Sequence, residues 1–388
     1  MRVAAWWTAT RLSLIGFVIL AAYLIGFDRD QRLADPGAWI AGRFTWADSF
    51  HYLRIADVGY LPPGLPCCDQ AFFPGYPLAI RAASVLTGGD LLWAGLLVSL
   101  LASAAAAWLL HEVAGRAGDP EVARVAVFYL GIAPYAIILT SVFTEALFLA
   151  CALAAWHFGR REAWGWAGLF ASLATLVRLN GLFVAVALVV MFLLARARGA
   201  SAATGADRLR PAALIGPGLF ALATPLLVAA GYAGYLHART GSWTAWSQAQ
   251  VIGWDRRSGW PWESLISGWH AVRSAQTPDL LVARIADLGA VGLGVLALVL
   301  LARRRRWPEL TYLGLSLAVL ICSNSVQSSN RYALTWFPVF VLAAEATVNW
   351  GRRHGHSHGW PIAAGLALVC VPLMVALALA QAAHLWIA

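Results

Sequence analysis

Lysine is absent from this sequence: all 28 positively charged residues are arginine, set against 19 acidic residues and a formal net charge of +9. The absence excludes a P-loop lysine that cradles nucleotide phosphates and a lysine that forms a Schiff base. Charge of either sign is also scarce, since 12% of the 388 residues are charged and 60% are hydrophobic. A soluble domain carries about 25% charged residues, so much of this surface faces lipid.

The arginines stand mostly in short segments between apolar runs. There they are typical of topology signals near anionic headgroups, and we expect membrane lipids, and no nucleic acid, as partners. No cysteine and histidine spacing resembles a zinc site, and no metal is predicted. His354, His356 and His358 are interpreted as a solvated loop. The adjacent Cys67 and Cys68 can form a disulfide on an oxidising side, which the sequence leaves open.

Apolar stretches of about 18 or more residues recur along the chain, a pattern typical of an all-α polytopic membrane protein. The first, near residues 8–27, has no small-residue cleavage site after it and is interpreted as an anchor. We predict a single transmembrane domain over residues 1–388 with about eleven spanning helices. The other ten are expected near residues 88–111, 121–141, 142–159, 163–179, 181–196, 212–236, 281–302, 308–327, 331–350 and 361–387.

Arginine placement predicts the orientation in the membrane. With the N-terminus in the cytoplasm, the densest arginine clusters, such as Arg303 to Arg306, all fall on the cytoplasmic side. The two long loops, residues 28–87 and 237–283, then lie on the extracytoplasmic side of the plasma membrane. Six tryptophans in the second loop are typical of an aromatic belt at the headgroup level. The alternative is a loop that covers or stacks on a sugar, for which Trp254 is the candidate.

Polar residues in the first outer loop form the first candidate site. If the run from Trp46 to Tyr60 is helical, three- and four-residue spacing places Asp48, His51 and Ile55 along one side. Arg54 can then reach Asp57 as an ordinary helix pair, and Gly59 suits the helix end. Taken alone, this segment is equally consistent with an interfacial helix whose polar residues have no special role.

Three further polar positions interrupt apolar runs at the same membrane face. Glu145 lies in SVFTEALF, Arg178 and Asn180 lie in LVRLNGL, and Arg331 lies in SSNRYALTWF. A carboxylate within a span costs several kcal/mol unless it is paired or wetted, so Glu145 indicates a functional site. Each arginine has a commoner alternative, a side chain at the end of a span that snorkels to the interface.

These positions suit one reaction class when taken together. An acceptor hydroxyl needs a base or an anion to orient it, and a phosphate leaving group needs fixed positive charge. Asp48 and Glu145 supply the first, and Arg178 and Arg331 supply the second, all at one face. The combination favours transfer of a sugar from a lipid-phosphate carrier.

Four segments carry a family resemblance: DSFHYLRIADVGY, AFFPGYPLAI, SVFTEALF and LVRLNGL, in this order within residues 43–183. They resemble the PIG-V family of GT-C type membrane glycosyltransferases, the second mannosyltransferases of GPI-anchor assembly. QVIGWDRRSGWPWESL and SSNRYALTWFP are similar to later segments of that family. The resemblance implies a GT-C fold whose first outer loop bears a short interfacial helix. It also implies inverting transfer of mannose from a polyprenyl-phosphate donor to a lipid-linked glycan or glycolipid acceptor, with no cofactor.

Carried over by position, the catalytic acid of the family falls on Asp48 and its second acidic position falls on Asp57. Its serine–glutamate step matches Thr144 and Glu145, and the arginine and asparagine of its RSNG-like motif match Arg178 and Asn180. The other candidates for substrate binding are His51, Tyr52, Trp254 and Arg331. The family reads Trp-Asp where Ala47 here separates Trp46 from Asp48, so the role of that tryptophan is not carried over.

Several alternatives stay open at the level of sequence. The composition, rich in arginine, alanine and glycine, is typical of a GC-rich bacterium, where the GPI pathway is not expected, so the acceptor is undetermined. The transferred sugar could instead be arabinose or glucose. The rivals from other classes are a lipid or glycolipid flippase or transporter, and a non-catalytic subunit of a glycan-assembly complex.

The orientation can be tested by cysteine labelling with a reagent that does not cross membranes. We expect a cysteine placed at Ser242 to react from outside and one placed at Trp307 to be protected, because arginine-rich loops stay in the cytoplasm. The reverse labelling pattern would contradict both the topology and the shared face of the candidate residues.

Overall fold

The structure is a computed structural model that describes residues 2–61, 67–115, 119–202, 216–355 and 359–383. Within these ranges the chain is helical, apart from turns and one isolated β-bridge between Ser258 and Ser323. In the described part of the chain, six helices are long and apolar enough to cross a membrane. They are α1 (Arg2–Ile25), α6 (Leu91–Gly115), α10 (Gly181–Ala202), α12 (Pro217–Thr240), α15 (Pro278–Arg303) and α19 (Trp360–Ala382). The predicted all-α polytopic membrane protein is confirmed.

The remaining predicted spans correspond to shorter helices. They are α7 (Pro120–Ile132), α8 (Glu145–Gly159), α9 (Trp164–Val177), α16 (Trp307–Ile321) and α18 (Phe337–Arg353). Each is shorter than the roughly 20 residues that cross a bilayer unaided. The count of eleven crossings therefore stays a prediction.

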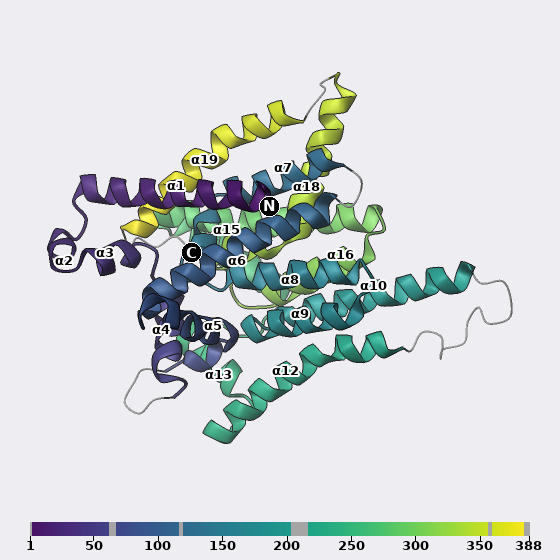
Figure 1. The fold of residues 1–388 in the computed structure, drawn as a ribbon, viewed down its shortest axis with the longest axis horizontal. Coiled ribbons are helices and arrows are strands. Elements are labelled where there is room, and N and C mark those ends of the chain that lie inside the picture. The colour runs from purple at the N-terminus through teal and green to yellow at the C-terminus, as the bar shows by residue number, and fades with distance from the viewer. Residues whose placement is uncertain (1, 62–66, 116–118, 203–215, 356–358, 384–388) are drawn as a thin grey trace.

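Helix α8 lies at the centre of the bundle and packs against both α6 and α9 (Figure 1). It is apolar all round and almost every residue is buried, which is typical of a helix surrounded by other helices. Five alanines among its fifteen residues allow neighbouring backbones to approach closely. The helix thus fixes the depth at which Glu145, its first residue, is placed.

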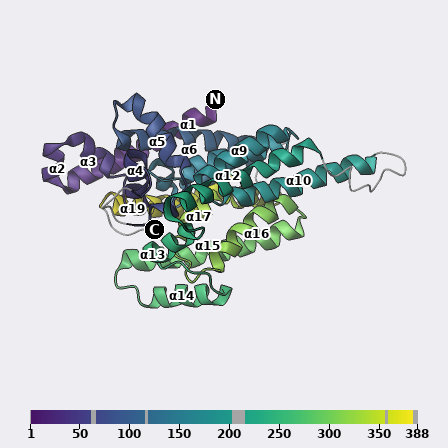
Figure 2. The same ribbon diagram turned by 90° about the horizontal axis from the view of Figure 1, so that it is seen from below.

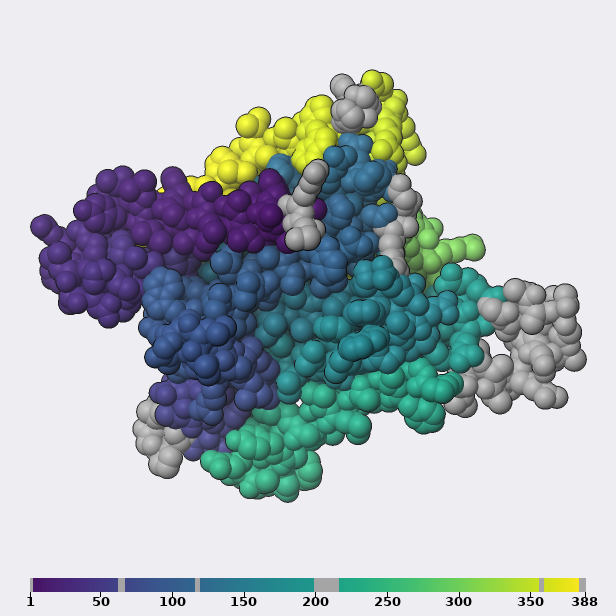
Figure 3. Space-filling model, in the orientation of Figure 1, coloured from purple at the N-terminus to yellow at the C-terminus, as the bar shows by residue number. Residues whose placement is uncertain are grey.

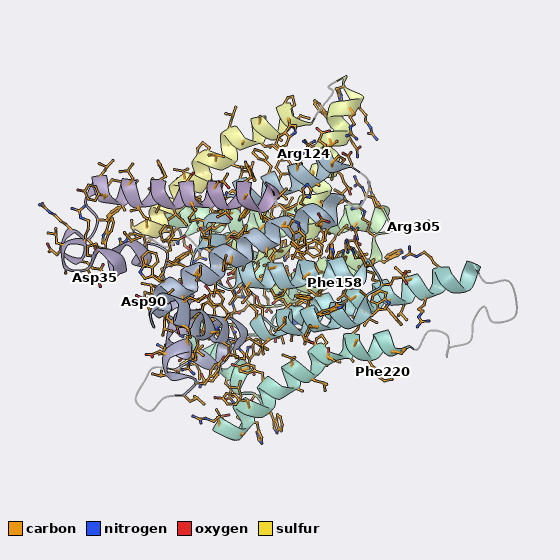
Figure 4. All side chains as sticks on the ribbon, viewed as in Figure 1. Asp35, Asp90, Arg124, Phe158, Phe220 and Arg305 are labelled. Carbon is orange, nitrogen blue, oxygen red and sulfur yellow. A yellow bond between two sulfur atoms is a disulfide. The ribbon has the colours of Figure 1, made fainter. Side chains whose placement is uncertain are left out.

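The long helices run between two ends of the molecule that differ in character (Figure 1). One end carries the first outer loop, and Figure 4 places Asp35 and Asp90 there. Arg124 and Arg305 lie toward the other end (Figure 4). There, Arg304 and Arg306 both pair with Glu345 at 2.5 Å. The first outer loop and the Arg303–Arg306 loop therefore lie toward different ends of the molecule.

The first outer loop is largely ordered into short helices. These are α2 (Arg29–Ala34), α3 (Pro36–Gly42), α4 (Asp48–Val58), the 3-10 turn η1 (Asp69–Ala71), α5 (Gly75–Ala83) and the 3-10 turn η2 (Ser84–Thr87). Helix α4 is the predicted short helix of this loop, and Gly59 ends it with φ of 79°, a conformation that glycine adopts without strain. Cys67 and Cys68 form a disulfide directly before η1.

The second outer loop is shorter than predicted, because α12 continues to Thr240 and α15 starts at Pro278. Hydropathy alone did not locate these ends, since both helices extend past their apolar parts. Between them lie α13 (Ala245–Trp254) and α14 (Pro261–Arg273), and α14 runs along α15 (Figure 2). Trp246 of α13 donates a hydrogen bond to the Ala71 carbonyl at 3.1 Å, so the second loop packs on the first.

The two terminal helices, α1 and α19, contact one another at one side of the bundle (Figure 3). The buried Arg43 guanidinium of the first loop joins this region by donating to the Ala382 carbonyl at 2.8 Å and pairing with Asp28 at 2.6 Å. At the opposite end, His354 stacks on Trp350. His356 and His358 lie outside the described residues.

Close packing of α9 on α12 depends on Gly168. A side-chain carbon at this position would overlap the backbone of Ala221. We expect Gly168→Ala to lower the thermal unfolding temperature in detergent, at a cost of about 1–3 kcal/mol for overpacking. Gly165→Ala, on the same helix with nothing within 4 Å, is the matched control and should be neutral or slightly stabilising. Equal unfolding temperatures for the two variants would contradict this packing.

Candidate active site

Asp48 is the first residue of α4, and the backbone before it is held in a rare conformation. Ala47 has φ of 47° and ψ of −115°, which a residue with a side chain rarely adopts and which is common at functional sites. Two hydrogen bonds anchor this turn to the segment before α8. Val142 donates to the Phe44 carbonyl at 3.0 Å, and the Ser49 hydroxyl donates to the Val142 carbonyl at 2.8 Å. The start of α4 is thereby fixed beside the start of α8.

Glu145 begins α8, and its side chain is fully buried. One carboxylate oxygen, Oε1, accepts from Arg178 at 2.6 Å and lies 3.1 Å from Nε of Arg331. Since a buried unpaired carboxylate is costly, these two guanidinium groups explain how a glutamate is kept inside an apolar bundle. Glu145, which the sequence indicated as a costly charge inside an apolar run, is therefore paired with two arginines.

Arg178 lies at the junction between α9 and α10. Helix α9 ends at Val177, Arg178 is extended with φ of −153°, and α10 starts at Gly181. A side chain on Gly181 would overlap the backbone at Thr175, so glycine allows this tight reversal. The reversal directs the guanidinium to Glu145 and to the Thr144 hydroxyl, which accepts at 3.1 Å.

Arg331 was predicted to begin a span. It lies instead in the four-residue helix α17 (Ser329–Tyr332), and the next long helix, α18, starts only at Phe337. Its side chain is 8% exposed and pairs with Asp48 at 2.8 Å as well as with Glu145. The snorkelling interpretation of both arginines is wrong, because buried carboxylates attract them inward. Asp287 of α15 fixes this short helix, because its carboxylate accepts a hydrogen bond from the backbone N–H of Asn330 at 3.2 Å.

Asp48, Arg331, Glu145 and Arg178 thus form a continuous series of ion pairs, which we call the ion-pair chain. The two carboxylates and two guanidinium groups balance in formal charge. The Tyr52 hydroxyl lies 3.4 Å from the Thr144 hydroxyl at the edge of this chain. The four charges come from segments that are far apart in the sequence, and the structure brings them together at one place.

A further guanidinium, that of Arg256, was missed by the sequence analysis. The Tyr332 ring lies 5.0 Å from Arg178, 5.5 Å from Arg331 and 5.6 Å from Arg256. Arg256 donates to the Gln327 carbonyl at 2.6 Å and is half-buried. Among the residues that the structure describes, it pairs with no carboxylate. Its charge is therefore available to an anionic ligand, and only its position in WDRRSGW could have suggested it.

His51, Arg54 and Asp69 form a second polar cluster beside the ion-pair chain. The Asp69 carboxylate accepts from Arg54 Nε at 2.8 Å and lies 2.7 Å from His51 Nδ1. The predicted pair of Arg54 with Asp57 is wrong, because Asp69 in the folded loop is the partner. Burial alone would raise the pKa of Asp69, but hydrogen bonds from His51 and Arg54 outweigh it and hold the pKa below its ordinary value.

Aromatic rings from both outer loops enclose His51. Its ring stacks on Phe72 at 4.8 Å between centroids and lies 5.4 Å from Trp254. Trp254 is thus beside the cluster, as a substrate-covering loop would require, whereas Trp260 and Trp262 are exposed and stacked on each other.

Two predicted site residues are not brought into these clusters. Asp57 is exposed at the far end of α4, and its carboxylate pairs with no residue in the described ranges. Asn180 precedes α10, and its backbone carbonyl accepts the first hydrogen bonds of that helix from Phe183 and Val184. No described residue bonds to its side chain.

An apolar cavity of about 480 Å³ lies beside α4, between α5, α9 and α12. Arg81 is the one charged residue of its lining, and this arginine also donates to the Ala56 carbonyl at 2.7 Å. The residues of the ion-pair chain do not line it. The other lining residues include Ile55, Pro77, Leu176, Leu227 and Tyr235.

Comparison with known proteins gives sequence matches to membrane mannosyltransferases. A family model described as dolichyl-phosphate-mannose-protein mannosyltransferase matches residues 69–206. GPI alpha-1,6-mannosyltransferase 2 of Cricetulus griseus is 34% identical over 154 residues, and that of Mus musculus is 35% identical over 155 residues. Each match covers 37% of this chain and 30% of the relative, so the chain spans under a third of the length of these relatives. The resemblance to the PIG-V family is confirmed.

Solved structures with a similar arrangement are also found. The apo oligosaccharyltransferase of Archaeoglobus fulgidus has a TM-score of 0.48 at 14% identity, covering 96% of this chain and 56% of that one. ArnT of Cupriavidus metallidurans, bound to undecaprenyl phosphate, has a TM-score of 0.47 at 14% identity, covering 96% and 71%.

The ion-pair chain should stabilise the fold only while it is complete. Glu145→Ala leaves Arg178 without a carboxylate partner and Arg331 with Asp48 alone. Removing one member of a buried pair costs about 3–5 kcal/mol, so we expect a clearly lower unfolding temperature in detergent. Glu112→Ala, whose side chain on α6 is 36% exposed, is the control and should unfold as the wild type does. An unchanged unfolding temperature for Glu145→Ala would show that the pairs contribute nothing to stability.

Proposed function

We propose that this chain, with its sequence likeness to GPI alpha-1,6-mannosyltransferase 2, is itself a mannosyltransferase. It transfers mannose, with inversion, from a polyprenyl-phosphate donor to a lipid-linked glycan or glycolipid acceptor. The reaction takes place at the extracytoplasmic face of the plasma membrane. The ion-pair chain is the observation that carries the proposal, because four separate segments bring acids and arginines together where the family resemblance places its acidic residues.

The likeness to mannosyltransferases supports the choice of sugar and donor. The curated relatives carry mannosyltransferase in their names, and the matching family model is named for dolichyl-phosphate mannose. A lipid-phosphate donor also fits a chain without lysine, which lacks the usual lysine contact to nucleotide phosphates. No cofactor takes part in this reaction.

The donor phosphate is the leaving group in this reaction. The acceptor oxygen bonds to the anomeric carbon, the bond from that carbon to the phosphate oxygen breaks, and the electron pair leaves with the phosphate. Arg178 and Arg331 stabilise the charge that develops there, and fixed positive charge in a partly dry site is effective for this purpose. Arg256, which has no carboxylate partner among the described residues, supplies the excess positive charge that binds the donor.

Carboxylates act at the acceptor and in support of the arginines. Asp48, with 13% of its side chain exposed, is the most open acid of the ion-pair chain and orients the acceptor hydroxyl. Glu145 holds both arginine forks in place. Asp57 is exposed at the end of α4, where it supports the site from a distance.

The lipid part of a substrate also has a place beside this site. The cavity between α4 and α12 is lined almost entirely by apolar side chains, and Arg81 is the one charged side chain among the described residues that line it. Such a surface suits an isoprenoid or acyl chain whose phosphate stays near a guanidinium. The cavity lies against the C-terminal part of α4, the helix that Asp48 begins.

The function can be tested with the purified protein in liposomes. Radiolabelled polyprenyl-phosphate mannose and a host lipid extract are added, and the labelled product is identified. We expect a mannosylated lipid from the wild type, and we expect Asp48→Asn to bind the donor without transfer. Movement of labelled donor across the bilayer without product would instead support a flippase. If product forms only with an arabinose or glucose donor, that sugar and not mannose is the one transferred. If no product forms with any donor, the result would support a non-catalytic subunit.

The arginines should contribute most in the transition state, where the phosphate gains charge. Arginine presents a planar fork that holds two phosphate oxygens, and lysine cannot copy it. We expect Arg178→Lys to lower turnover by roughly ten- to a thousandfold, or about 1.4–4 kcal/mol, and Arg331→Lys to follow the same trend. Arg124→Lys, toward the opposite end of the molecule, is the control. Wild-type turnover in both site variants would refute the phosphate role.

A further inference from the structure

Helix α14 of the second outer loop packs one side against the bundle and exposes the rest. Its buried residues are Ser264 and Gly268, and a side-chain carbon on Gly268 would overlap the side chains of Leu288 and Val326. The Ser264 hydroxyl donates to the Ile321 carbonyl at 2.8 Å, which joins α14 to the end of α16. Because this side is fixed, the other sides of α14 are the ones that face the surroundings.

The exposed part of α14 divides into two stripes. The exposed polar residues form one stripe: Glu263, Ser267 and His270. The exposed apolar residues form the other, and their spacing of three and four places them along one side of the helix: Trp262, Leu265, Ile266 and Trp269. We call these four residues the apolar stripe. An exposed helix surface divided in this way is typical of the boundary between lipid and water.

The depth of α14 follows from helix α16. The backbone N–H of Gly259, just before α14, donates to the Cys322 carbonyl at 2.9 Å, so α14 begins at the level where α16 ends. Helix α16 has 15 residues and is about 22 Å long, whereas the hydrocarbon core of a bilayer is roughly 30 Å thick. With the Arg303–Arg306 loop at the cytoplasmic boundary, as the arginine pattern predicts, α14 begins within the outer leaflet.

Helix α15 provides a lipid-facing surface that the apolar stripe continues. This helix is long and apolar enough to cross a membrane. Only residues 274–277 connect it to α14, and Gly268 lies against Leu288, so the last turns of α14 run beside the first turns of α15 (Figure 2). Those first turns of α15 also expose apolar side chains, namely Leu281, Val282 and Ile285. Both helices therefore expose apolar side chains over the length along which they pack.

The two ends of the apolar stripe match the chemistry of lipid headgroups. Trp262 stacks on Trp260 with 5.0 Å between ring centroids, and both rings are exposed. Exposed tryptophan is enriched where lipid chains meet headgroups. Arg273 continues the spacing of the stripe four residues after Trp269, and a guanidinium at a helix end reaches lipid phosphates. An apolar stripe that ends in an arginine complements an anionic headgroup layer.

We propose that α14 docks in the outer leaflet of the bilayer, with the apolar stripe against lipid chains and the polar stripe toward water. The second outer loop is then partly a membrane-docked segment. The segment that carries Arg256 leads directly into α14, so docking holds this guanidinium at a constant depth relative to the lipid phosphates. Docking requires no sugar, and the inference therefore does not rest on the proposed function.

Spin labels at two neighbouring exposed positions test this docking. The free cysteines are removed by Cys151→Ala, Cys322→Ser and Cys370→Ala. A nitroxide is then attached to Ile266→Cys or to Ser267→Cys, and the full chain is reconstituted in liposomes of phosphatidylcholine and phosphatidylglycerol. We expect the label at position 266 to collide with oxygen, which concentrates among lipid chains, and to be shielded from a water-soluble nickel complex. The label at position 267, the matched control on the polar stripe, should show the opposite preference.

A second measurement uses the native membrane and needs no cysteine. The photoreactive residue p-benzoyl-phenylalanine replaces Ile266 or Ser267, the intact membranes are irradiated, and the adducts are identified by mass spectrometry. We expect phospholipid adducts at position 266 and clearly fewer at position 267.

Two results would overturn the inference. Equal nickel accessibility at positions 266 and 267 would mean that the apolar stripe lies in water. A protein adduct in place of lipid at position 266 would mean that the stripe binds a protein partner. Neither measurement involves mannosyl transfer, so both judge the docking of α14 whether or not the transfer assay gives product.

Discussion

A buried series of ion pairs decides how the rest of this protein is arranged. Asp48, Arg331, Glu145 and Arg178 lie in surroundings where any one charge alone would be costly, and together they satisfy one another. Their pairing requires the start of α4, the start of α8, the α9–α10 junction and the short helix α17 to converge at one place. The outer loops are then built around this point, with α13 of the second loop resting on η1 of the first.

In the ion-pair chain the charges balance, so the residues that stabilise the fold differ from the one that offers excess charge to a ligand. Because two acids offset two arginines, the ion-pair chain itself buries no excess charge. The positive excess comes from Arg256, which shares the Tyr332 ring with Arg178 and Arg331 but lies on the second outer loop. The second loop thus contributes both this charge and Trp254, whose ring lies 5.4 Å from that of His51.

The sequence predicted the class of protein and helix α4. It also predicted that Asp48, Glu145, Arg178 and Arg331 lie near one another, because each charge is costly inside an apolar bundle and arginine placement indicates the orientation of the loops. It did not predict partners. Arg54 has Asp57 three residues away, yet it pairs with Asp69 because the loop folds back. The predicted lengths of α8 and α9 were too long. Both helices are enclosed by other helices, so apolar residues continue past their ends and hydropathy does not mark where the helices stop. The only signal for Arg256 was its place in WDRRSGW, since an arginine in a polar loop is ordinary until Tyr332 is placed beside it.

The shared guanidinium of Arg331 also restricts how this sequence can drift over evolutionary time. Loss of Glu145 leaves one cation in excess, and loss of Arg331 leaves one anion in excess, because Glu145 keeps Arg178 while Asp48 loses its partner. Either change is therefore expected to be costly as a first step. Substitutions at positions 48, 145, 178 and 331 are therefore expected to be coupled, even though Glu145 and Arg331 stand 186 positions apart in the chain. In a lineage that retains the fold, we expect the four positions to be inherited as a unit.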